Sequence, residues 1–358
     1  MRIVVNDIAA SSGGALSILK GFYNFLVKSK HGRENEWIFL LSDDYIEETD
    51  NIKVIVLDEI KKKWISRLKF DLYSGKSFIS ELKPDVVFSL QNTITFGLNI
   101  PQVLYMHQSL PFQKVKKFSF FKSEERVLAV YQYFIGKLIK ESVKKADITV
   151  VQTKWIKNAV IEVTNISPNK IINVFPPQEG CIKIKGNRQI NNKYFFYPAA
   201  NNLYKNHQCI YDACTVLRKR GIEDYRISLT IEGGNIEHNI SYLGNISYEQ
   251  VIEKYNTSIL IFPSYIETIG LPLLEARQVG TIILASDCPF SREVLVGYEN
   301  GYFFDPFKPQ QLAELMEEVI LGQIKIKKTV ANKNDNNNLN NGWQKVIDIL
   351  LSKGRDMK

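Results

Sequence analysis

Short apolar runs alternate along the chain with longer segments in which apolar residues recur every three or four positions. The first pattern is typical of strands buried in a parallel sheet, and the second of helices that cover its faces. In the first half of the chain the predicted strands are Ile3–Val5, Trp37–Ser42, Ile52–Leu57, Val86–Leu90, Val103–His107 and Ile148–Gln152. This alternation predicts an α/β domain.

The pattern breaks after Val174–Pro177, and residues 179–193 are polar, with several Gly, Asn and Lys residues. It restarts with predicted strands at Tyr194–Tyr197, Arg226–Glu232, Ser258–Phe262 and Thr281–Ser286. The length of 358 residues also suits two domains, because most domains have roughly 100–200 residues.

Two such series in succession predict two Rossmann-like domains, with parallel sheets that face a central cleft. We predict an N-terminal domain over residues 1–178, a linker over 179–193 and a C-terminal domain over 194–358. An amphipathic segment at residues 342–353 predicts a helix that packs back on the N-terminal domain.

The net charge is +8, and cations alternate with aromatic and aliphatic residues in Lys61–Phe70 and Lys114–Lys122. Such runs usually form solvated faces of helices or loops. They also suit an anionic membrane surface, where aromatic side chains insert and each basic residue contributes about 1 kcal/mol. The residues leave both interpretations open. No nucleic-acid-binding motif accompanies the charge, so we do not expect nucleic acid as a partner.

The sequence has neither a signal-peptide core nor an apolar stretch of the ~20 residues that a membrane span requires. Its four cysteines lack CxxC spacing, which favours reduced thiols and makes a cysteine metal site improbable. We therefore expect a cytoplasmic protein, peripheral on the inner face of the cell membrane if the basic stretches bind lipid.

The stretch Ile261–Gly280 combines the end of a strand, a loop and the start of a helix. The loop carries Glu267, and Gly270 allows a positive φ or the close approach of a ligand. Pro272 suits the first position of a helix, which puts Glu275 in its opening turn. Since the first amides of a helix lack partners, they form a site for phosphate. Two carboxylates therefore flank a predicted phosphate site.

This stretch reads Pro-Ser-x-x-Glu-x-x-Gly-Leu-Pro-x-x-Glu-Ala from Pro263 to Ala276. It resembles the Glu-x7-Glu motif of the retaining GT-B glycosyltransferases, the family of glycosyl transferases group 1 (family 4 type). Tyr242–Ser247 and Asp147–Thr153 resemble further elements of the family, so the likeness extends over nearly the whole chain. It implies the GT-B fold and transfer of a sugar from a nucleoside diphosphate sugar with its anomeric configuration kept.

The resemblance implies that the N-terminal domain binds the acceptor and that the C-terminal domain binds the nucleotide sugar. It also implies roles for individual residues. Glu267 matches the residue that contacts donor-sugar hydroxyls, Glu275 the ribose ligand, and Lys205 the lysine that neutralises the leaving diphosphate. Leu243 and Gly244 match the Leu-Gly element with which family members usually hold the base of the nucleotide. The amides expected to face the sugar and diphosphate are those of Thr268, Ile269, Gly270 and Leu271.

One position departs from the family. Many members have an arginine about five residues before the lysine, where this chain has Ala200; Asn201 or Asn202 is the expected substitute. His107 resembles a histidine near the transferred sugar. Gly13 and Gly14 resemble a glycine-rich loop near the diphosphate and acceptor, although a Gly-Gly pair is also a common tight turn.

No two aspartates are spaced as Asp-x-Asp, so we expect no metal and no cofactor beyond the sugar nucleotide. Fixed amides and Lys205 would then stabilise the leaving group. By resemblance, the acceptor attacks on the face from which the diphosphate departs, and the leaving phosphate takes its proton.

The sequence therefore predicts a retaining glycosyltransferase that moves a hexose-type sugar from a UDP- or GDP-sugar to a glycan or lipid-linked oligosaccharide, in surface polysaccharide biosynthesis. Two alternatives stay open. One is a sugar-nucleotide epimerase of similar fold, which would need no acceptor. The other is a non-catalytic, membrane-associated protein that binds nucleotide sugars. A dinucleotide oxidoreductase is disfavoured, because Ser11–Ser17 supplies no Gly-x-Gly-x-x-Gly.

Overall fold

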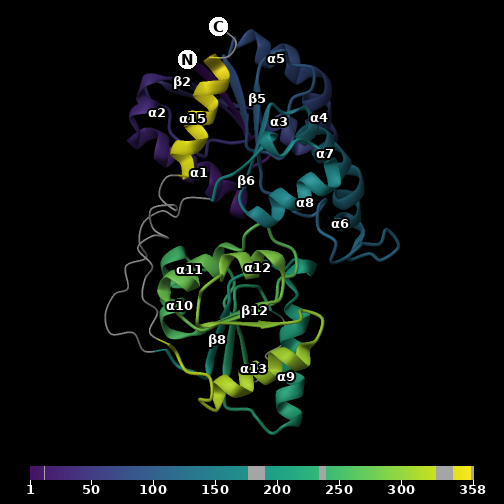
Figure 1. The fold of residues 1–358 in the computed structure, drawn as a ribbon, viewed down its shortest axis with the longest axis vertical. Coiled ribbons are helices and arrows are strands. Elements are labelled where there is room, and N and C mark those ends of the chain that lie inside the picture. Colours follow the sequence, from purple (N-terminus) through teal and green to yellow (C-terminus); the bar gives the residue numbers. More distant parts are fainter. Residues whose placement is uncertain (12, 176–189, 234–238, 328–341, 356–358) are drawn as a thin grey trace. The chain divides into compact units, whose positions relative to one another are not determined.

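The computed structural model describes residues 1–11, 13–175, 190–233, 239–327 and 342–355, which form two compact units (Figure 1). The first unit comprises Met1–Phe121, Arg126–Glu179 and Lys333–Lys358, and the second comprises Lys122–Glu125 and Gly180–Asn332. Of the predicted linker over residues 179–193, the part up to residue 189 lies outside the described residues.

The first unit is built on a parallel sheet of seven strands in the order β3-β2-β1-β4-β5-β6-β7. Its strands are β1 (Arg2–Asn6), β2 (Glu36–Leu41), β3 (Ile52–Val56), β4 (Val86–Ser89), β5 (Gln102–Met106), β6 (Ile148–Val151) and β7 (Ile171–Asn173). Six of them coincide with predicted apolar runs, and the short edge strand β7 was not predicted.

Helices connect these strands. They are α1 (Gly13–Lys28), α2 (Lys30–Glu34), α3 (Asp58–Lys62), α4 (Trp64–Lys69), α5 (Gly75–Glu81), α6 (Arg126–Val130), α7 (Gly136–Lys145) and α8 (Lys154–Thr164), with π-helical turns at Phe70–Ser74 and Tyr131–Ile135 and a 3₁₀ turn at Pro168–Lys170. Residues 126–145 form α6, a π-helical turn and α7 in succession.

Alternation of side chains along the strands builds a separate core on each face of the first sheet. Ile3 and Val5 of β1 belong to one buried cluster, and Val4 between them belongs to another. The first cluster contains side chains of α1, and the second contains Phe70 and Ile79 from the segment around α5. Burial on both faces explains why these strands are apolar throughout.

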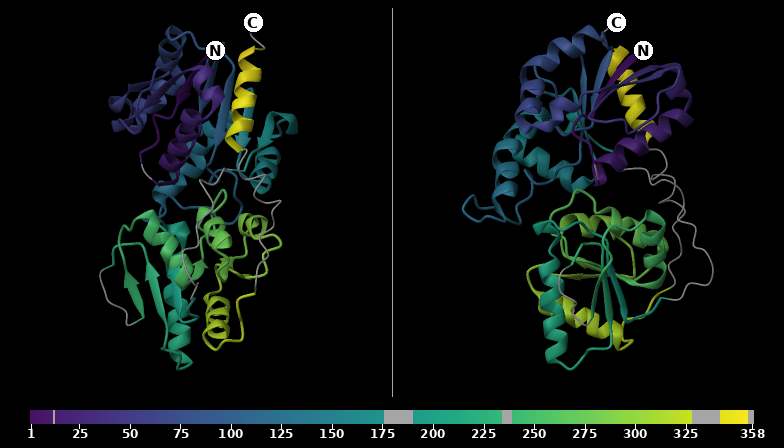
Figure 2. Two further views of the ribbon diagram at one scale, coloured as in Figure 1. Left: turned by 90° about the vertical axis from the view of Figure 1, so that its left-hand side faces the viewer. Right: turned by 180° about the vertical axis from the view of Figure 1, so that it is seen from behind.

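The last helix, α15 (Gly342–Arg355), packs on the sheet of the first unit (Figure 2). Its Trp343 ring lies 5.1 Å from Phe22 of α1 and 5.5 Å from Tyr105 of β5, measured between ring centroids. The end of the chain therefore completes the core of the N-terminal unit, as the fold prediction required.

The second unit contains a parallel six-stranded sheet in the order β10-β9-β8-β11-β12-β13. Its strands are β8 (Tyr194–Tyr197), β9 (Arg226–Leu229), β10 (Ile240–Tyr242), β11 (Ile259–Phe262), β12 (Ile283–Ser286) and β13 (Gly301–Phe304). Its helices are α9 (His207–Lys219), α10 (Tyr248–Thr257), α11 (Leu271–Val279), α12 (Pro289–Val294) and α13 (Pro309–Ile320), with a 3₁₀ turn at Leu203–Lys205. The fold is thus α/β with two Rossmann-like parallel sheets, which confirms the predicted fold class.

Each sheet reverses its strand order once. The reversal lies between β1 and β4 in the first unit and between β8 and β11 in the second. In open α/β sheets, ligands bind beyond the carboxyl ends of the strands at such a switch point. The fold therefore marks one candidate position in each unit.

Candidate functional site

The switch point of the second sheet brings together two loops that the sequence singles out. The loop after β8 leads through a 3₁₀ turn to Lys205, and the loop after β11 carries Glu267. Because β8 and β11 are hydrogen-bonded neighbours, both loops leave the same edge of the sheet side by side. Residues 62 positions apart in sequence thereby come into contact.

Lys205, Glu267 and Ser264 form the centre of this site. The Nζ atom of Lys205 lies 2.5 Å from Oε1 of Glu267, and the Oγ atom of Ser264 donates to the same oxygen at 2.7 Å. The two charged side chains are only 18% and 15% exposed. Water therefore screens this ion pair less than it would screen a pair at the surface.

Backbone contacts fix the two loops to each other. The hydroxyl of Tyr197 donates to the carbonyl oxygen of Lys205 at 2.9 Å, and the amide of Tyr265 donates to that of Tyr204 at 3.1 Å. Asn206, in a left-handed conformation with φ of 61°, donates through its side-chain amide to the carbonyls of Pro263 and Pro306. Lys205 and Glu267 are therefore held in place from both sides.

Electrostatics keep Lys205 charged. Burial lowers the pKa of Lys205, but the attraction of the Glu267 carboxylate more than offsets this and leaves the pKa above its ordinary value. The neighbouring His207 responds in the opposite way, because burial and then the positive charge of Lys205 lower its pKa to about 4. At neutral pH the site thus carries a fixed cation beside a neutral imidazole.

Helix α11 begins directly after the Glu267 loop. Gly270 has φ of 74°, and a Cβ atom there would lie 3.2 Å from both Leu273 Cδ1 and Phe262 Cζ, so the position needs glycine for its conformation and its space. The helix starts at Leu271, which makes Pro272 its second residue. Glu275 therefore lies just beyond the first turn, one residue later in the helix than the sequence suggested.

Glu275 is held apart from Glu267. Its Oε2 atom accepts a hydrogen bond from the hydroxyl of Tyr255, at 3.0 Å, on α10. Burial raises the pKa of Glu275, and hydrogen bonds from Tyr255 and Tyr248 oppose that shift. The two glutamates of the motif thus have different surroundings, one paired with a lysine and one with tyrosines.

The other predicted donor residues follow the same sheet edge. Thr268, Ile269, Gly270 and Leu271 form the short connection from Glu267 into α11. Leu243 and Gly244 come directly after β10, and their amides donate to carbonyls of Leu229 and Ile231. Asn201 is exposed in the loop before Lys205.

His107, Gly13 and Gly14 belong to the first unit. His107 follows β5, its amide donates to Oδ1 of Asn92 at 2.7 Å, and burial lowers its pKa to about 4. Gly13 and Gly14 are the first residues of α1, and Gly13 has φ of 59°. The structure therefore groups the predicted residues into one set on each unit.

Sequence reasoning missed several residues at these two edges. Ser264 is part of the quoted motif but had no assigned role, and Tyr255 lies 20 residues before its partner Glu275 with no sequence signal to link them. In the first unit it missed Asp7, which directly follows β1 and is 1% exposed. A carboxylate directly after a buried strand was the available signal for Asp7.

Asp7 makes the stability of the protein depend on pH. Burial raises the pKa of Asp7 to about 7, although the charges of Arg67 and Lys61 and the nearby Ala10 amide lower it in part. Ionisation therefore costs folding free energy as the pH rises from about 4, the pKa in an unfolded chain, through about 7.

Asp7→Asn removes this cost. We expect the variant to exceed the wild type in unfolding free energy at pH 8 by up to about 4 kcal/mol, as the shift implies. The difference should shrink as the pH falls to 4. Urea unfolding at pH 5 and pH 8 measures it, and equal pH dependence in the two proteins would contradict a buried, titrating Asp7.

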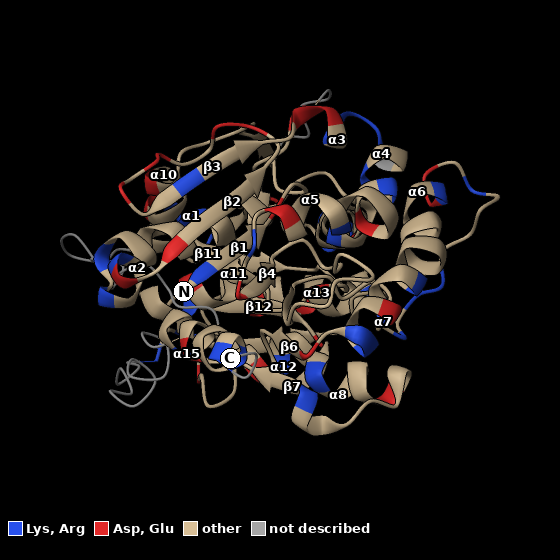
Figure 3. Cartoon of the chain, turned by 90° about the horizontal axis from the view of Figure 1, so that it is seen from above, with Lys and Arg blue, Asp and Glu red and all other residues tan. Residues whose placement is uncertain are grey.

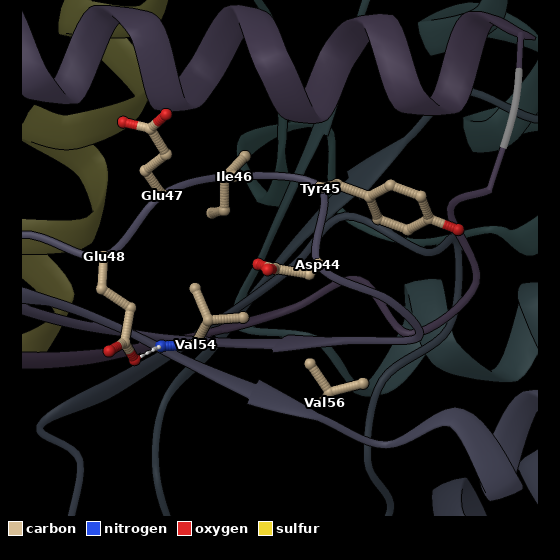
Figure 4. A pocket seen from close by; sticks show the side chains of 7 residues that line it. All are labelled: Asp44, Tyr45, Ile46, Glu47, Glu48, Val54 and Val56. Atoms are coloured by element: carbon tan, nitrogen blue, oxygen red, sulfur yellow. Dashed lines mark hydrogen bonds between the residues drawn. The ribbon is translucent and has the colours of Figure 1, made fainter.

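A pocket of about 790 Å³ lies elsewhere in the first unit, between the edge strand β3 and the segment 44–48 (Figure 4). Its lining includes Asp44, Glu47 and Glu48, and the last accepts a hydrogen bond from the amide of Val54. Three carboxylates without a lining cation repel a diphosphate. This pocket is therefore a poor candidate for the donor site.

Among the residues that the structure describes, no three His, Cys, Asp or Glu side chains are grouped as a metal site would require. Cys209, Cys214 and Cys288 are buried thiols, and Cys181 lies outside the described residues. Independence from metal remains a prediction.

Comparison with known proteins agrees with the fold. Residues 182–336, which include Lys205, Glu267 and Glu275, match the family model of glycosyl transferases group 1. The O-antigen chain mannosyltransferase RfbU of Salmonella typhimurium is 22% identical over 287 residues, which cover 72% of this chain and 79% of that protein. The serotype-specific mannosyltransferase WbdA of Escherichia coli is 34% identical over 84 residues, 23% of this chain and 10% of WbdA.

Solved structures match both units. WaaG, a glycosyltransferase involved in lipopolysaccharide biosynthesis, gives a TM-score of 0.65 at 12% identity and covers 97% of this chain and 99% of its own. The lipopolysaccharide outer core galactosyltransferase WaaB gives 0.61 at 17% identity, with 100% and 99% covered. Anabaena HepE, solved with UDP-glucose, gives 0.63 at 12% identity, with 99% and 98% covered.

Two parallel sheets of this order, in a chain that such structures match end to end, define the GT-B fold. The second unit matches the family of glycosyl transferases group 1 over residues 182–336, and this match together with that to RfbU supports glycosyltransferase activity.

Proposed function

We propose that the protein is a retaining, metal-independent hexosyltransferase. It takes its sugar from a UDP- or GDP-sugar and passes it to a glycan or lipid-linked oligosaccharide during surface polysaccharide biosynthesis. The observation that carries this proposal is the Lys205–Glu267–Ser264 contact at the switch point of the second sheet. The names of RfbU and WbdA favour mannose as the transferred sugar, and the name of RfbU favours an O-antigen chain as the product.

The proposed chemistry uses the charges of this site. The bond between the anomeric carbon and the diphosphate oxygen breaks, and Lys205 neutralises the charge that develops on the leaving group. Glu267 holds Lys205 and offers its other oxygen to a hydroxyl of the donor sugar. The acceptor oxygen forms the new bond on the same face, and its proton passes to the departing phosphate.

Glu275 binds the ribose in this proposal. An ionised carboxylate accepts hydrogen bonds from two adjacent ribose hydroxyls, and Tyr255 holds its Oε2 atom in position. The missing arginine leaves Lys205 as the cation that this proposal assigns to the diphosphate. The amides between Thr268 and Leu271 add partial positive charge at the start of α11.

Calorimetric titration of the full chain with UDP- and GDP-sugars tests the donor class. We expect either the UDP-sugars or the GDP-sugars to bind. We also expect the mannosyl group of the donor to be transferred to an acceptor with its anomeric configuration kept, as NMR coupling constants of the product would show. Absence of binding to every sugar nucleotide contradicts the proposal. Release of an altered sugar nucleotide without any acceptor favours the epimerase instead.

We further propose that the protein associates with anionic membranes through one of its two basic stretches. Lys61–Phe70 is unsuited, because Lys61 donates to the Ala10 carbonyl, Arg67 donates to the Gln91 carbonyl and Phe70 is buried. In the second stretch, Phe121 is 96% exposed. No described helix is long and apolar enough to cross a bilayer.

Further apolar side chains surround Phe121. Val127 and Phe134 are exposed, and Phe120 contacts the rings of Tyr133 and Phe134. Basic residues lie along the loop beside α6 and along α7 (Figure 3). Apolar side chains that enter the lipid interface among such cations are typical of membrane-surface contacts.

Replacing both Phe121 and Phe134 by serine should reduce co-flotation with phosphatidylglycerol vesicles about 10-fold or more, because two large apolar side chains no longer enter the lipid. Val296→Ser, at a position 70% exposed in the second unit, is the matched control and should float as the wild type does. Equal flotation of the double variant and the wild type would refute this membrane contact.

A further inference from the structure

Asn92 holds His107 at two points. The backbone amide of His107 donates to Oδ1 of Asn92 at 2.7 Å, and Nδ2 of Asn92 lies 3.1 Å from Nε2 of the His107 ring. Asn92 belongs to the loop after β4, and His107 directly follows β5, the hydrogen-bonded neighbour of β4. One side chain thus fixes both the backbone and the ring of His107.

These two contacts determine which ring nitrogen of His107 carries the proton. A backbone amide can only donate, so the atom of Asn92 that it meets must be the oxygen Oδ1. The other terminal atom of Asn92 is then the NH2 group, which can also only donate. Nε2 must therefore accept, which it can do only without a proton. The neutral ring thus carries its proton on Nδ1.

This tautomer leaves the ring without an available base. The lone pair of Nε2 accepts from Asn92, and Nδ1, which carries the proton, is buried and has no hydrogen-bond partner among the described residues. A general base needs a bare nitrogen within hydrogen-bond reach of the proton that it takes. Neither nitrogen of His107 meets this requirement.

The surroundings of His107 also keep the ring neutral. An imidazolium would place an N–H group at Nε2, facing the NH2 group of Asn92. Burial, and then the positive charge of Arg67 on α4, lower the pKa of His107 to about 4. The ring of Tyr105 lies 6.3 Å from that of His107, and burial raises the pKa of its hydroxyl, so it stays neutral. Arg67 acts on Asp7 as well, whose pKa is about 7.

The loop that carries Asn92 is held on both sides of this residue. Asn92 has φ of 68°, a conformation that asparagine adopts more readily than most residues. Its neighbours Gln91 and Thr93 donate through their side chains to the two carboxylate oxygens of Asp71, at 3.0 and 2.8 Å. Asp71 is 1% exposed and lies in the π-helical turn Phe70–Ser74, a kind of irregularity that is frequent at functional sites. The position of Asn92 is therefore fixed by a buried carboxylate.

We propose that Asn92 is a positioning residue for the proposed sugar transfer, and that it keeps His107 as a neutral Nδ1–H imidazole that takes no part in acid–base chemistry. This inference rests on the proposed function, which the family resemblance links to His107. It adds Asn92 to the residues predicted from the sequence and limits His107 to a role without proton transfer. The proton of the attacking hydroxyl is then left to the departing phosphate, as the proposed mechanism requires.

Asn92→Asp is the test variant. It keeps the shape of the side chain and the contact with the His107 amide, but it replaces the NH2 group by an oxygen that can only accept. The ring should therefore carry a proton on Nε2, and the new carboxylate should raise the pKa of His107 from about 4 to at least about 5. Asn165→Asp is the matched control, because Asn165 is also left-handed, with φ of 54°, but is exposed at the end of α8 in the same unit. A cooperative thermal transition shows that each variant is folded.

Two-bond ¹H–¹⁵N correlation spectra of the full chain, labelled at its four histidines, show which ring nitrogen is protonated. The signals of His107 are those lost in His107→Gln. Between about pH 6 and pH 8 we expect a protonated Nδ1 and a bare Nε2 in the wild type and in Asn165→Asp, and a protonated Nε2 in Asn92→Asp. A protonated Nε2 in the wild type, or a His107 that titrates there within this range, would overturn the inference even if Asn92→Asp did not fold.

The dependence of the transfer rate on pH gives the functional readout. Since His107 exchanges no proton in this inference, the profile of kcat against pH should keep its inflections in His107→Gln, whatever its absolute rate. In Asn92→Asp the profile should gain an inflection at the pKa of His107 that NMR gives, because the charge of the ring now changes with pH; Asn165→Asp should show none. Loss of an inflection in His107→Gln would assign proton transfer to His107, and a profile unchanged in Asn92→Asp would leave Asn92 as a support of the loop alone.

The two measurements separate this inference from the function on which it rests. A wild type that binds no sugar nucleotide and transfers no sugar refutes the proposed function, while the NMR spectra still decide the protonation of His107. A wild type that transfers sugar with Nε2 of His107 protonated refutes the role of Asn92 and leaves the transferase intact.

Discussion

Glu267→Gln is expected to lower the rate of sugar transfer by about 100-fold or more. The substitution keeps the length of the side chain but removes the charge that holds Lys205 at 2.5 Å. It also leaves Ser264 beside an amide in place of a carboxylate. Removing one preorganised charged contact at a reacting centre costs roughly 2.7–4 kcal/mol of barrier, or 10²–10³ in rate. Initial rates at saturating donor and acceptor measure the effect.

Glu253→Gln is the control for this variant. It lies on α10 of the same unit and its side chain is exposed, so the change in net charge is the same while the site is untouched. Its rate should equal that of the wild type. Sugar transfer by Glu267→Gln at the wild-type rate would show that Glu267 takes no part in the reaction. The proposed mechanism would then lose its main support.

Stability of Glu267→Gln needs a separate measurement, because Lys205 loses its counter-charge in a position that is 18% exposed. Breaking a shielded pair by removing one partner destabilises a protein, since the remaining charge is left unpaired. The double variant Lys205→Met with Glu267→Gln should recover part of the lost unfolding free energy without recovering any activity. That divergence distinguishes a catalytic role from a structural one.

Much of the fold was predictable because burial on both faces makes the central strands apolar throughout. Ile3–Val5 and Ile148–Gln152 are such runs, and both became strands. The short strands β7, β10 and β13 were not predicted. They lie at or beside sheet edges, where three or four residues give too little apolar pattern to recognise.

The second-unit site was predictable because its residues are close in sequence to recognisable features. Glu267, Gly270 and Glu275 lie within nine positions of one motif, and Lys205 follows the first strand of its domain. Tyr255 was not predictable as the partner of Glu275, because only the packing of α10 on α11 brings them together.

The first unit shows where sequence patterns mislead. Lys61 and Arg67 looked like members of a basic surface stretch, yet each donates to a backbone carbonyl at the carboxyl edge of the sheet. Residue types alone do not reveal which cations of a run turn inward. Asp7 had the same ambiguity, since a carboxylate after a strand is more often solvated than buried.

The second large effect concerns Lys205, whose replacement by alanine should weaken UDP or GDP binding about 10- to 100-fold. A hydrogen bond to a charged group contributes roughly 1.5–3 kcal/mol. Ala200 stands where many family members have an arginine. Lys205 should therefore contribute a larger share of diphosphate binding than it would beside a second cation. Calorimetry with the nucleoside diphosphate and, in parallel, with uridine or guanosine measures the loss.

The comparison of ligands decides the role of Lys205. In this proposal the nucleoside contacts Glu275 and the residues after β10, and it does not contact Lys205. Its affinity should therefore change less than about 2-fold in the variant, because a charge that does not touch a ligand contributes little to its binding. Lys193→Ala removes a lysine that pairs with Asp224 at the surface of the same unit, and should leave both ligands unaffected. Equal losses for diphosphate and nucleoside would mean that Lys205 supports the loops and does not contact phosphate. A loss of affinity for the diphosphate alone would indicate a direct contact between Lys205 and phosphate. Added salt should then weaken diphosphate binding in the wild type but not in the variant, because salt screens the attraction of Lys205 and this attraction is absent once the lysine is replaced.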